Sequence, residues 1–426
     1  MTTECTPRQL EFQGLGRRSL VARFDGGSIS SDGGGLLLQE VDRRIRILSR
    51  FADCFVDHRR SELIEHSVAE LVSQRVYGLA LGYEDLNDHD ELRWDPLMGL
   101  LAGKSDPSGH TRVGERDRGK ALAGKSTLSR LELTPAKTGP GAQEDRFFHG
   151  YYRHYCYLPL YVFCGEHLLC ARLRPSNIDA SLGTVAELER IVGAIRAAWP
   201  EVRIVVRGDS GFCREQIMSW CEANGVDYVL GIAKNARLKA SITDELAQAE
   251  ALYEATGRAA RVFKDFRYRT LKSWSRERRV VGKAEHLAQG PNPRFVVTSL
   301  APEEMEVRGL YEDLYCARGD MENRIKEQPL ALFADRTSTA TMRANQLRLY
   351  FSSIAYVLLQ NLRRLGLAGT ELAKAQCDTI RLKLMKIGAQ IRITTRKVWV
   401  SLSQSYPYAG LFWLVYERLR LQPLRC

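Results

Sequence analysis

Residues 201–233 carry the pattern that most restricts how this chain can fold. A short β-branched run ends at Asp209 and is followed by a helical pattern from Arg214 to Asn224. A glycine then stops the helix, and a second apolar run extends from Val226 to Ala233. This order predicts a β-α-β unit with Asp209 at the carboxyl end of its first strand, where ligands of open α/β sheets bind. The alternative is that Asp209 only forms a turn or begins the helix.

A second pattern lies between Tyr315 and Lys326. At helical period, one apolar stripe and one polar stripe run side by side: Leu314, Ala317, Met321 and Ile325, and beside them Tyr315, Arg318, Glu322 and Lys326. A helix that buries the apolar stripe holds an aromatic ring, a guanidinium, a carboxylate and an amine in one column. The alternative is a surface helix with Arg/Glu and Glu/Lys pairs, each worth about 0.3–0.5 kcal/mol.

Together these residues resemble the DDE transposases of bacterial insertion sequences, in the branch marked by Tyr-x2-Arg-x3-Glu. Tyr315, Arg318 and Glu322 fit that pattern at its own spacing, and residues 207–212 look like the family's second-aspartate block. Blocks at residues 24–34, 74–85 and 146–152 are similar to the subgroup named for the thirteen-eighty element. The resemblance therefore covers nearly the whole chain.

The resemblance implies a fold and an activity. The expected fold is α/β: a ribonuclease-H-like mixed sheet flanked by helices, with an inserted β-rich subdomain at about 240–300 and an N-terminal helical region. The expected activity is cleavage and transfer of DNA strands, in which two divalent metal ions activate the attacking oxygen and stabilise the leaving one. Asp209 and Glu322 would be ligands of Mg²⁺ or Mn²⁺, with Tyr315 and Arg318 orienting the glutamate or the scissile phosphate. The expected partner is double-stranded DNA at the element's terminal repeats, bound by a homo-oligomer.

One departure from the family concerns the first catalytic aspartate. In the resembled subgroup an Asp-rich strand stands just before the block at 146–152, whereas here residues 137–145 read as a polar linker. This indicates that the first catalytic strand is deleted and that cleavage is impaired. Glu144 and Asp145 are the nearby candidates to replace the lost ligand. The alternative function is a catalytically inactive, DNA-binding remnant of a transposase.

A second departure follows Glu322. The family usually carries a lysine seven residues after the glutamate, and that position here is Pro329. Lys326, one helical turn after Glu322, is the residue on the same face that we expect to reach a DNA phosphate.

The flanking segments are predicted as strands and helices around these two acids. Apolar-aromatic strands are expected at Phe147 to Tyr157, Leu160 to Cys164 and Leu168 to Leu173, followed by an amphipathic helix within 177–199. Asp209 and Glu322 are separated by 322 − 209 = 113 residues, which is more than one crossover needs. The inserted subdomain would account for the surplus.

The expected insertion is rich in cations interleaved with aromatic residues. They are Lys264, Arg267, Arg269, Lys272, Arg276, Arg278 and Arg279, with Phe263, Phe266, Tyr268 and Trp274. This pattern favours contact with DNA phosphates and stacking on bases, above all for Lys264, Arg267, Arg269 and Lys272. The alternative is a basic hairpin face that only meets solvent.

A third function is raised by residues 119–127, which satisfy the phosphate-loop pattern G-x4-G-K-[ST]. A working loop of this kind would place Lys125 on nucleotide phosphates and make the chain an ATPase. The mechanism needs a buried strand before the loop, and none is predicted at 112–118. The alternative is a basic surface segment that leads into a helix near Leu128 to Leu133.

Composition bounds the remaining possibilities. The chain has 62 Lys and Arg against 51 Asp and Glu, a net charge of +11 that favours polyanions. The ten cysteines show no zinc spacing, and no run approaches the length of a membrane span. We expect a cytoplasmic protein, associated with the nucleoid when bound to DNA. The predicted domains are 1–110, a linker at 111–145, a transposase core at 146–365 and a basic region at 366–426.

Overall fold

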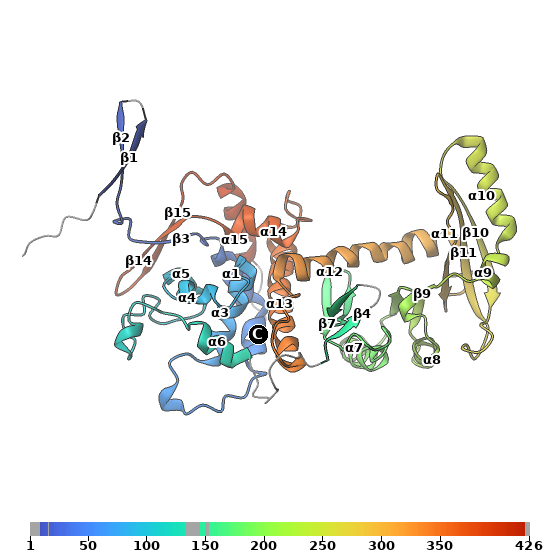
Figure 1. The fold of residues 1–426 in the computed structure, drawn as a ribbon, viewed down its shortest axis with the longest axis horizontal. Coiled ribbons are helices and arrows are strands. Elements are labelled where there is room, and N and C mark those ends of the chain that lie inside the picture. Colours follow the sequence, from blue (N-terminus) through green and yellow to red (C-terminus); the bar gives the residue numbers. More distant parts are fainter. Residues whose placement is uncertain (1–8, 16, 133–144, 150–152, 422–426) are drawn as a thin grey trace, which may run out of the picture. The chain divides into compact units, whose positions relative to one another are not determined.

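The computed structural model of the protein describes residues 9–15, 17–132, 145–149 and 153–421 (Figure 1). Its contacts divide the chain into two units. The terminal unit contains residues 1–144 and 326–426, and the central unit contains residues 145–325. No helix within the described ranges has the length and apolar character that crossing a lipid bilayer requires.

The terminal unit consists mainly of helices around one long helix, α13. Its helices are α1 (Gly35–Ile45), α2 (Ile47–Ala52), α3 (Val68–Leu81), α4 (Asp88–Leu92), α5 (Pro96–Leu101), α6 (Lys125–Glu132), α13 (Met342–Leu362), α14 (Cys377–Ile380), α15 (Ala409–Leu421) and the second half of α12 (Gly319–Leu332). Its strands are β1 (Leu10–Leu15), β2 (Arg18–Ala22), β3 (Ser28–Ser30), β14 (Ala389–Ile393) and β15 (Val398–Leu402). β1 pairs with β2, and β3 pairs with β14 in a three-stranded sheet ordered β15-β14-β3.

Capping and a buried ion network fix α3 against α6 and α13. α3 begins at a capping box, in which Ser67 and Glu70 each bond the other's backbone amide. Glu132 of α6 is fully buried and accepts hydrogen bonds from Arg75 of α3 at 2.8 Å and from Arg348 of α13 at 2.7 Å. A buried carboxylate needs partners for its charge, and guanidiniums from two other helices supply them here. Glu132 therefore links α3, α6 and α13 at one point.

The glycine-rich block at 24–34 has a structural explanation in this unit. A Cβ on Gly34 would collide with the backbone carbonyl oxygen of Leu384, so only glycine lets the two chain segments approach. Asp32, which is fully buried, accepts hydrogen bonds from Lys386 and from the Tyr83 hydroxyl, both at 2.6 Å. The block therefore joins the start of α1 to the start of β14.

The central unit contains a mixed sheet flanked by helices. Its strands are β4 (Phe147–His149), β5 (His154–Cys156), β6 (Leu160–Cys164), β7 (His167–Arg172), β8 (Val205–Gly208), β9 (Asp227–Ile232), β10 (Ala260–Tyr268), β11 (Arg278–Leu287), β12 (Gly290–Pro291) and β13 (Arg294–Thr298). Its helices are α7 (Thr184–Ala198), α8 (Glu215–Ala223), α9 (Ala236–Ala240), α10 (Thr243–Thr256), α11 (Val307–Gly309) and the first part of α12.

The predicted β-α-β unit is confirmed. β8 and β9 are parallel, and α8 connects them. The remaining neighbours in the sheet are antiparallel, in the order β10-β11-β13-β9-β8. The strands expected as an inserted subdomain therefore continue the same sheet, because β13 pairs directly with β9.

Two apolar cores cover the two faces of this sheet. On one face, side chains of α7, α8, α9 and α10 pack on alternate strand residues such as Tyr228, Leu230 and Val297. On the other face, Leu310 and Tyr311 pack on Val229, Val281 and Val296. The alternation of side chains along each strand thus sends neighbouring residues into different cores.

Two short hairpins stand apart from the large sheet. The segment predicted as one strand from Phe147 to Tyr157 folds back on itself, so that β4 pairs with β5, and the prediction of a single strand is wrong. β6 pairs with β7 in a second two-stranded sheet. Among the described residues neither hairpin pairs with β8, which is therefore the last strand of the large sheet.

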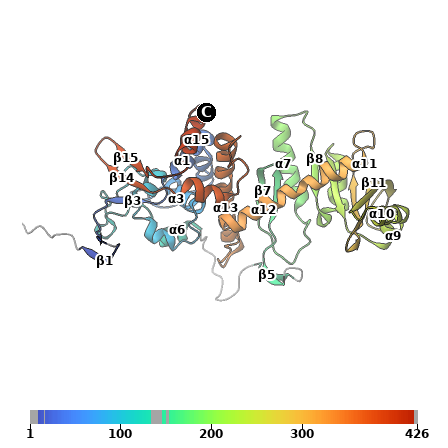
Figure 2. The same ribbon diagram turned by 90° about the horizontal axis from the view of Figure 1, so that it is seen from above.

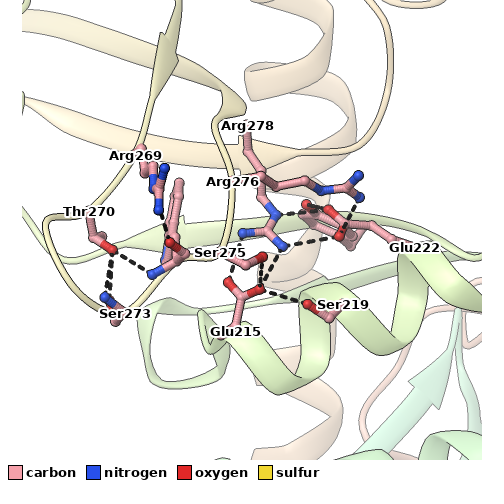
Figure 3. Close-up of polar contacts among 11 residues, drawn as sticks. Glu215, Ser219, Glu222, Arg269, Thr270, Ser273, Ser275, Arg276 and Arg278 are labelled. Atoms are coloured by element: carbon pink, nitrogen blue, oxygen red, sulfur yellow. Dashed lines mark hydrogen bonds and ion pairs between the residues drawn. The ribbon is translucent and has the colours of Figure 1, made fainter.

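An ion cluster holds the loop between β10 and β11 on α8 (Figure 3). Arg278, which is buried, donates to Glu215 and Glu222 of α8, at 2.8 Å in each case. Arg276 pairs with Glu222 at 2.5 Å, and Ser275 donates to Glu215 at 2.5 Å. Burial alone would raise the pKa of Glu215, but the hydrogen bonds from Arg278, Ser275 and Ser219 lower it to about 2.

We predict that Arg278→Met lowers the free energy of unfolding by about 3–5 kcal/mol, because it leaves two carboxylates without their buried cation. Arg276→Gln, at a side chain that is 60% exposed, should cost less than about 1 kcal/mol. The stabilisation from Glu215 is present above its unfolded pKa of about 4.3 and is lost as the pH falls toward 2. The difference in the free energy of unfolding between the unmodified chain and Arg278→Met should therefore become smaller as the pH is lowered. Urea unfolding at several pH values measures this, and a difference independent of pH would contradict it.

Candidate active site

Asp209 follows β8 directly, at the carboxyl end of the strand. Its backbone is extended, and its carboxylate accepts a hydrogen bond from the Gly211 amide at 2.8 Å, where a 3₁₀ turn begins. Along β8, Val205 packs in the core that contains Leu310, and Val206 packs in the opposite core. Because side chains alternate in a strand, Asp209 belongs to the same face as Val205. Its carboxylate is therefore at the end of the strand on the face that carries Leu310.

One continuous helical segment crosses that face of the sheet. It consists of α11, a π-helical stretch at Leu310–Tyr315, a 3₁₀ turn at Cys316–Arg318 and then α12 (Figures 1 and 2). The segment starts beside β10, where the rings of Phe263 and Tyr311 lie 5.7 Å apart. It reaches β8 at Leu314, whose carbonyl oxygen accepts from Arg207 at 2.8 Å. The helix thus runs across the strands from β10 to β8.

Tyr315 marks the point where this helix meets the end of β8. A Cβ placed on Gly231 of β9 would be 2.5 Å from the Tyr315 hydroxyl oxygen and 3.2 Å from the Ser210 amide nitrogen. The hydroxyl therefore rests on the bare backbone of Gly231, next to the turn that follows Asp209. The structure brings Tyr315 and the Asp209 turn together, although the two are far apart in the sequence.

Glu322 lies further along the same helix. It follows Tyr315 by 322 − 315 = 7 residues, about 10 Å along a helix axis at 1.5 Å per residue. Two residues later, Arg324 forms an ion pair at 3.1 Å with Glu166, in the turn between β6 and β7. Glu322 therefore lies on the span of helix between the last strand of the large sheet and the β6–β7 hairpin. Its side chain is exposed.

The described residues do not make a complete metal site. No group of three or more His, Cys, Asp or Glu side chains within those ranges is arranged to hold a metal ion. Asp145, one of the two acids predicted to replace the missing ligand, belongs to no such group, and Glu144 lies outside the described residues. The donor set that we can place thus falls short of the several carboxylates that a pair of hard divalent cations needs.

The predicted apolar stripe is only partly correct. Leu314, Met321 and Ile325 are half-buried, but Ala317 is exposed. The prediction assumed a uniform 3.6-residue period, whereas the chain is π-helical and then 3₁₀ between residues 310 and 318. These turns change the angle per residue, so a residue spaced for one face arrives on another. Arg318 has helical backbone in the 3₁₀ turn, and Lys326 is exposed on α12.

Some of the cations predicted to contact DNA are used inside the central unit. Arg278 holds the loop to α8, and Arg279 is buried, donating to Asp265 at 2.8 Å and to two backbone carbonyls. Tyr268 and Trp274 are also buried, so the prediction that they stack on bases is wrong. These residues are unavailable for contact with DNA because the loop between β10 and β11 folds onto α8 and the sheet.

The four cations singled out for DNA contact differ in their surroundings. Arg267 and Lys272 are exposed. Arg269 is exposed too, and its Nε donates to the Trp274 carbonyl at 3.2 Å. Lys264 forms an ion pair with Glu245 at 3.1 Å. Arg267 and Lys272 are therefore the two most available to an outside anion.

The phosphate-loop pattern at residues 119–127 does not form a nucleotide cradle. The Lys125 amide donates to the Asp90 carboxylate at 3.0 Å, and the Lys125 ammonium lies 3.4 Å from the same group. The Ala123 amide donates to Gln74 at 3.1 Å. Between residues 112 and 118 the backbone forms a 3₁₀ turn and no strand. A carboxylate thus occupies the place where phosphate would bind, and the ATPase hypothesis loses its basis.

Sequence reasoning missed Gly231 and Arg207 as parts of this site. A lone glycine inside an apolar strand is the signal that another group approaches the backbone closely, and Gly231 shows it within the run 226–233. Arg207 gives no such signal, because its partner is a backbone carbonyl 107 residues away.

Comparison with protein families gives one match that spans the chain. The model for the transposase DDE domain, group 1, matches residues 12–140 and 138–424. The two matched stretches meet at residues 138–140, inside the segment predicted to be a linker. Comparison with curated proteins gives no match.

We predict that Gly231→Ala destabilises the chain by about 1–3 kcal/mol, because the added methyl overlaps the Tyr315 hydroxyl. Removing that hydroxyl in the double variant Gly231→Ala, Tyr315→Phe should recover part of the loss, so the two effects are not additive. Gly193→Ala, where a Cβ meets nothing within 4 Å, is the matched control and should be neutral or stabilising. Thermal unfolding of the intact chain compares Gly231→Ala, Tyr315→Phe, the double variant and Gly193→Ala with the unmodified chain. Strict additivity would mean that Tyr315 does not rest on Gly231.

Proposed function

The chain belongs to the family of transposases with a DDE domain, and on this premise we propose that it binds the ends of an insertion sequence as double-stranded DNA. We propose further that it retains the second aspartate and the glutamate of the catalytic set, as Asp209 and Glu322. The first aspartate is missing, so strand cleavage and transfer are impaired.

The break in the sheet is the observation that supports this proposal most. In a ribonuclease-H-like fold the first catalytic strand lies in the middle of a continuous sheet. Here β8 ends one sheet, β6 and β7 form another, and among the described residues no strand joins them. The helix that bears Glu322 extends from the first sheet to the second hairpin. The family match also consists of two stretches, which overlap at residues 138–140, just before these strands.

The retained residues have distinct roles in this proposal. Asp209, at the end of β8, and Glu322, on the crossing helix, offer carboxylate oxygens of the kind that divalent cations prefer. Tyr315 positions the helix on the Asp209 turn, and Arg318 neutralises a phosphate or orients Glu322. Two carboxylates bind a hard cation weakly, so we assign no step that depends on a bound Mg²⁺ or Mn²⁺ pair.

DNA binding in this proposal uses the excess of positive charge. Arg267 and Lys272 of the central unit are exposed, and Lys326 follows Glu322 by one turn on the same helix. Each phosphate that they neutralise would release counterions, which makes binding depend strongly on salt. We propose that the chain acts on the element's terminal repeats as a homo-oligomer, so that two DNA ends are held together.

A second candidate function is a catalytically inactive remnant that occupies the element's ends. The same break in the sheet favours it, because among the residues that the structure describes no strand presents a third carboxylate to Asp209 and Glu322. Such a chain would compete with an intact transposase for DNA ends, or join its oligomer.

The test is a binding and nicking assay on duplexes taken from the DNA that flanks the coding sequence. We expect salt-sensitive binding and, with Mg²⁺ or Mn²⁺, slow nicking. Asp209→Asn and Glu322→Gln should each abolish that nicking without weakening binding. Asp313→Asn is the matched control, because Asp313 is an exposed acid on the same helical segment, and it should leave nicking unchanged.

Each outcome separates the alternatives. Binding without nicking in either metal identifies the inactive remnant. Nicking that survives Asp209→Asn would show that the chemistry lies elsewhere. Absence of binding by the unmodified chain would reject the DNA-binding proposal as a whole.

A further inference from the structure

The hairpin of β14 and β15 has one packed face and one exposed face. Ala389 and Ile391 of β14 pack with Leu97 in the terminal unit, and Val400 and Leu402 of β15 lie against the same core. The alternate residues, including Arg392 and Trp399, point the other way and are exposed. Toward the turn, even the paired residues Ile393 and Val398 are 38% and 36% exposed. The hairpin therefore extends beyond the core that supports its base.

The segment around this hairpin contains no acidic residue. From Thr379 to Tyr416 the chain has six cations and neither Asp nor Glu. Two of the six are used internally, because Arg381 donates to backbone carbonyls and Lys386 pairs with buried Asp32. Lys383 lies over the ring of Tyr408. The remaining three, Arg392, Arg396 and Lys397, are exposed on the hairpin and have no acidic partner among the described residues.

Trp399 lies between two of these cations. It pairs directly across the hairpin with Arg392, and the guanidinium and the Lys397 ammonium lie 5.8 Å and 5.4 Å from the centre of the indole ring. The ring remains 48% exposed. An exposed indole flanked by cations that no carboxylate neutralises is well matched to a partner that is both anionic and aromatic or apolar.

The turn of the hairpin is ordered by Thr394. Its amide and hydroxyl both donate to the Lys397 carbonyl, at 2.9 Å and 2.8 Å, and its hydroxyl accepts from the Lys397 amide at 3.1 Å. The cations at the turn therefore start from a fixed backbone, which reduces the entropy lost when they bind a partner. Figures 1 and 2 show the hairpin running out from the helices of its unit.

We propose that this hairpin is a two-stranded β-ribbon that contacts double-stranded DNA, with Arg392, Arg396 and Lys397 on phosphates and Trp399 against the groove. The major groove is wide enough for such a ribbon, and the local charge has the sign that duplex DNA requires. The inference rests on the proposed function only in that the chain binds DNA. It is independent of Asp209, Glu322 and any cleavage.

The test measures binding of labelled duplexes in EDTA, so that cleavage plays no part. Arg392→Gln with Lys397→Gln should weaken binding and reduce the slope of log K against log salt by about two, one for each lost phosphate contact. Trp399→Ala should weaken binding roughly fivefold or more and leave the slope unchanged. Arg392→Lys with Lys397→Arg keeps both charges and should keep the slope.

The matched control is Arg50→Gln with Lys374→Gln, which removes one arginine and one lysine from exposed positions of the same unit. It lowers the net charge equally and should change the slope much less. Unchanged thermal unfolding of every variant confirms that the hairpin's support is intact.

The outcomes distinguish this inference from the proposed function. If the unmodified chain binds duplex DNA and the hairpin variants behave like the control, the ribbon is not a DNA contact, while the proposed function stands. If the hairpin variants bind duplexes as well as the unmodified chain does and lose only the binding of single-stranded DNA, the inference is overturned too. Failure of all proteins to bind rejects both.

Discussion

The packing of one helical segment across a mixed sheet governs the arrangement of the central unit. The segment meets β10 through the rings of Tyr311 and Phe263, and reaches β8 through the hydrogen bond from Arg207 to the Leu314 carbonyl. Tyr315 then approaches so closely that the strand beneath it must carry glycine at 231. Because these contacts fix the helix at both sides of the sheet, the backbone at Asp209 and the start of α12 have little freedom relative to each other.

The large sheet and the β6–β7 hairpin of the central unit differ in how they are held. The helix, β8 and β9 form an intact layered structure with an apolar core on each face of the sheet. The β6–β7 hairpin forms its own sheet, and its contacts include the ion pair of Arg324 with Glu166 and the ion pair of Arg172 with Glu187 of α7. A carboxylate presented from a central strand would need backbone pairing on both sides. Within the described residues β8 has a strand neighbour on one side only, and no group of three or more His, Cys, Asp or Glu side chains is arranged to hold a metal ion.

The parts of this structure that the sequence predicts are those determined by local patterns. The β-α-β unit at 201–233 is of this kind, since strand propensity, helical period and a terminating glycine all lie within one short window. The burial of Arg278 is not, because its partners Glu215 and Glu222 lie 63 and 56 residues away and nothing in the local pattern distinguishes it from an exposed cation. The phosphate-loop pattern at 119–127 did not predict a nucleotide site for the same reason. Its backbone amides donate to Asp90 and Gln74, which come from helices distant in the sequence.

The π-helical stretch at Leu310–Tyr315 has a consequence for how this helix can change over time. A π turn holds one residue more than an α turn, so the loss of a single residue there would restore a regular α-helix. The wide turn takes up its extra residue locally, so Glu322 would keep nearly its present direction, and Leu310 and Tyr311 would stay in their core. The same deletion in the regular part of α12 before Glu322 would instead rotate everything downstream by about 100° about the helix axis, one residue's worth of twist. The π stretch is thus a place where the chain can lose a codon without turning its acidic side chain away from the sheet edge.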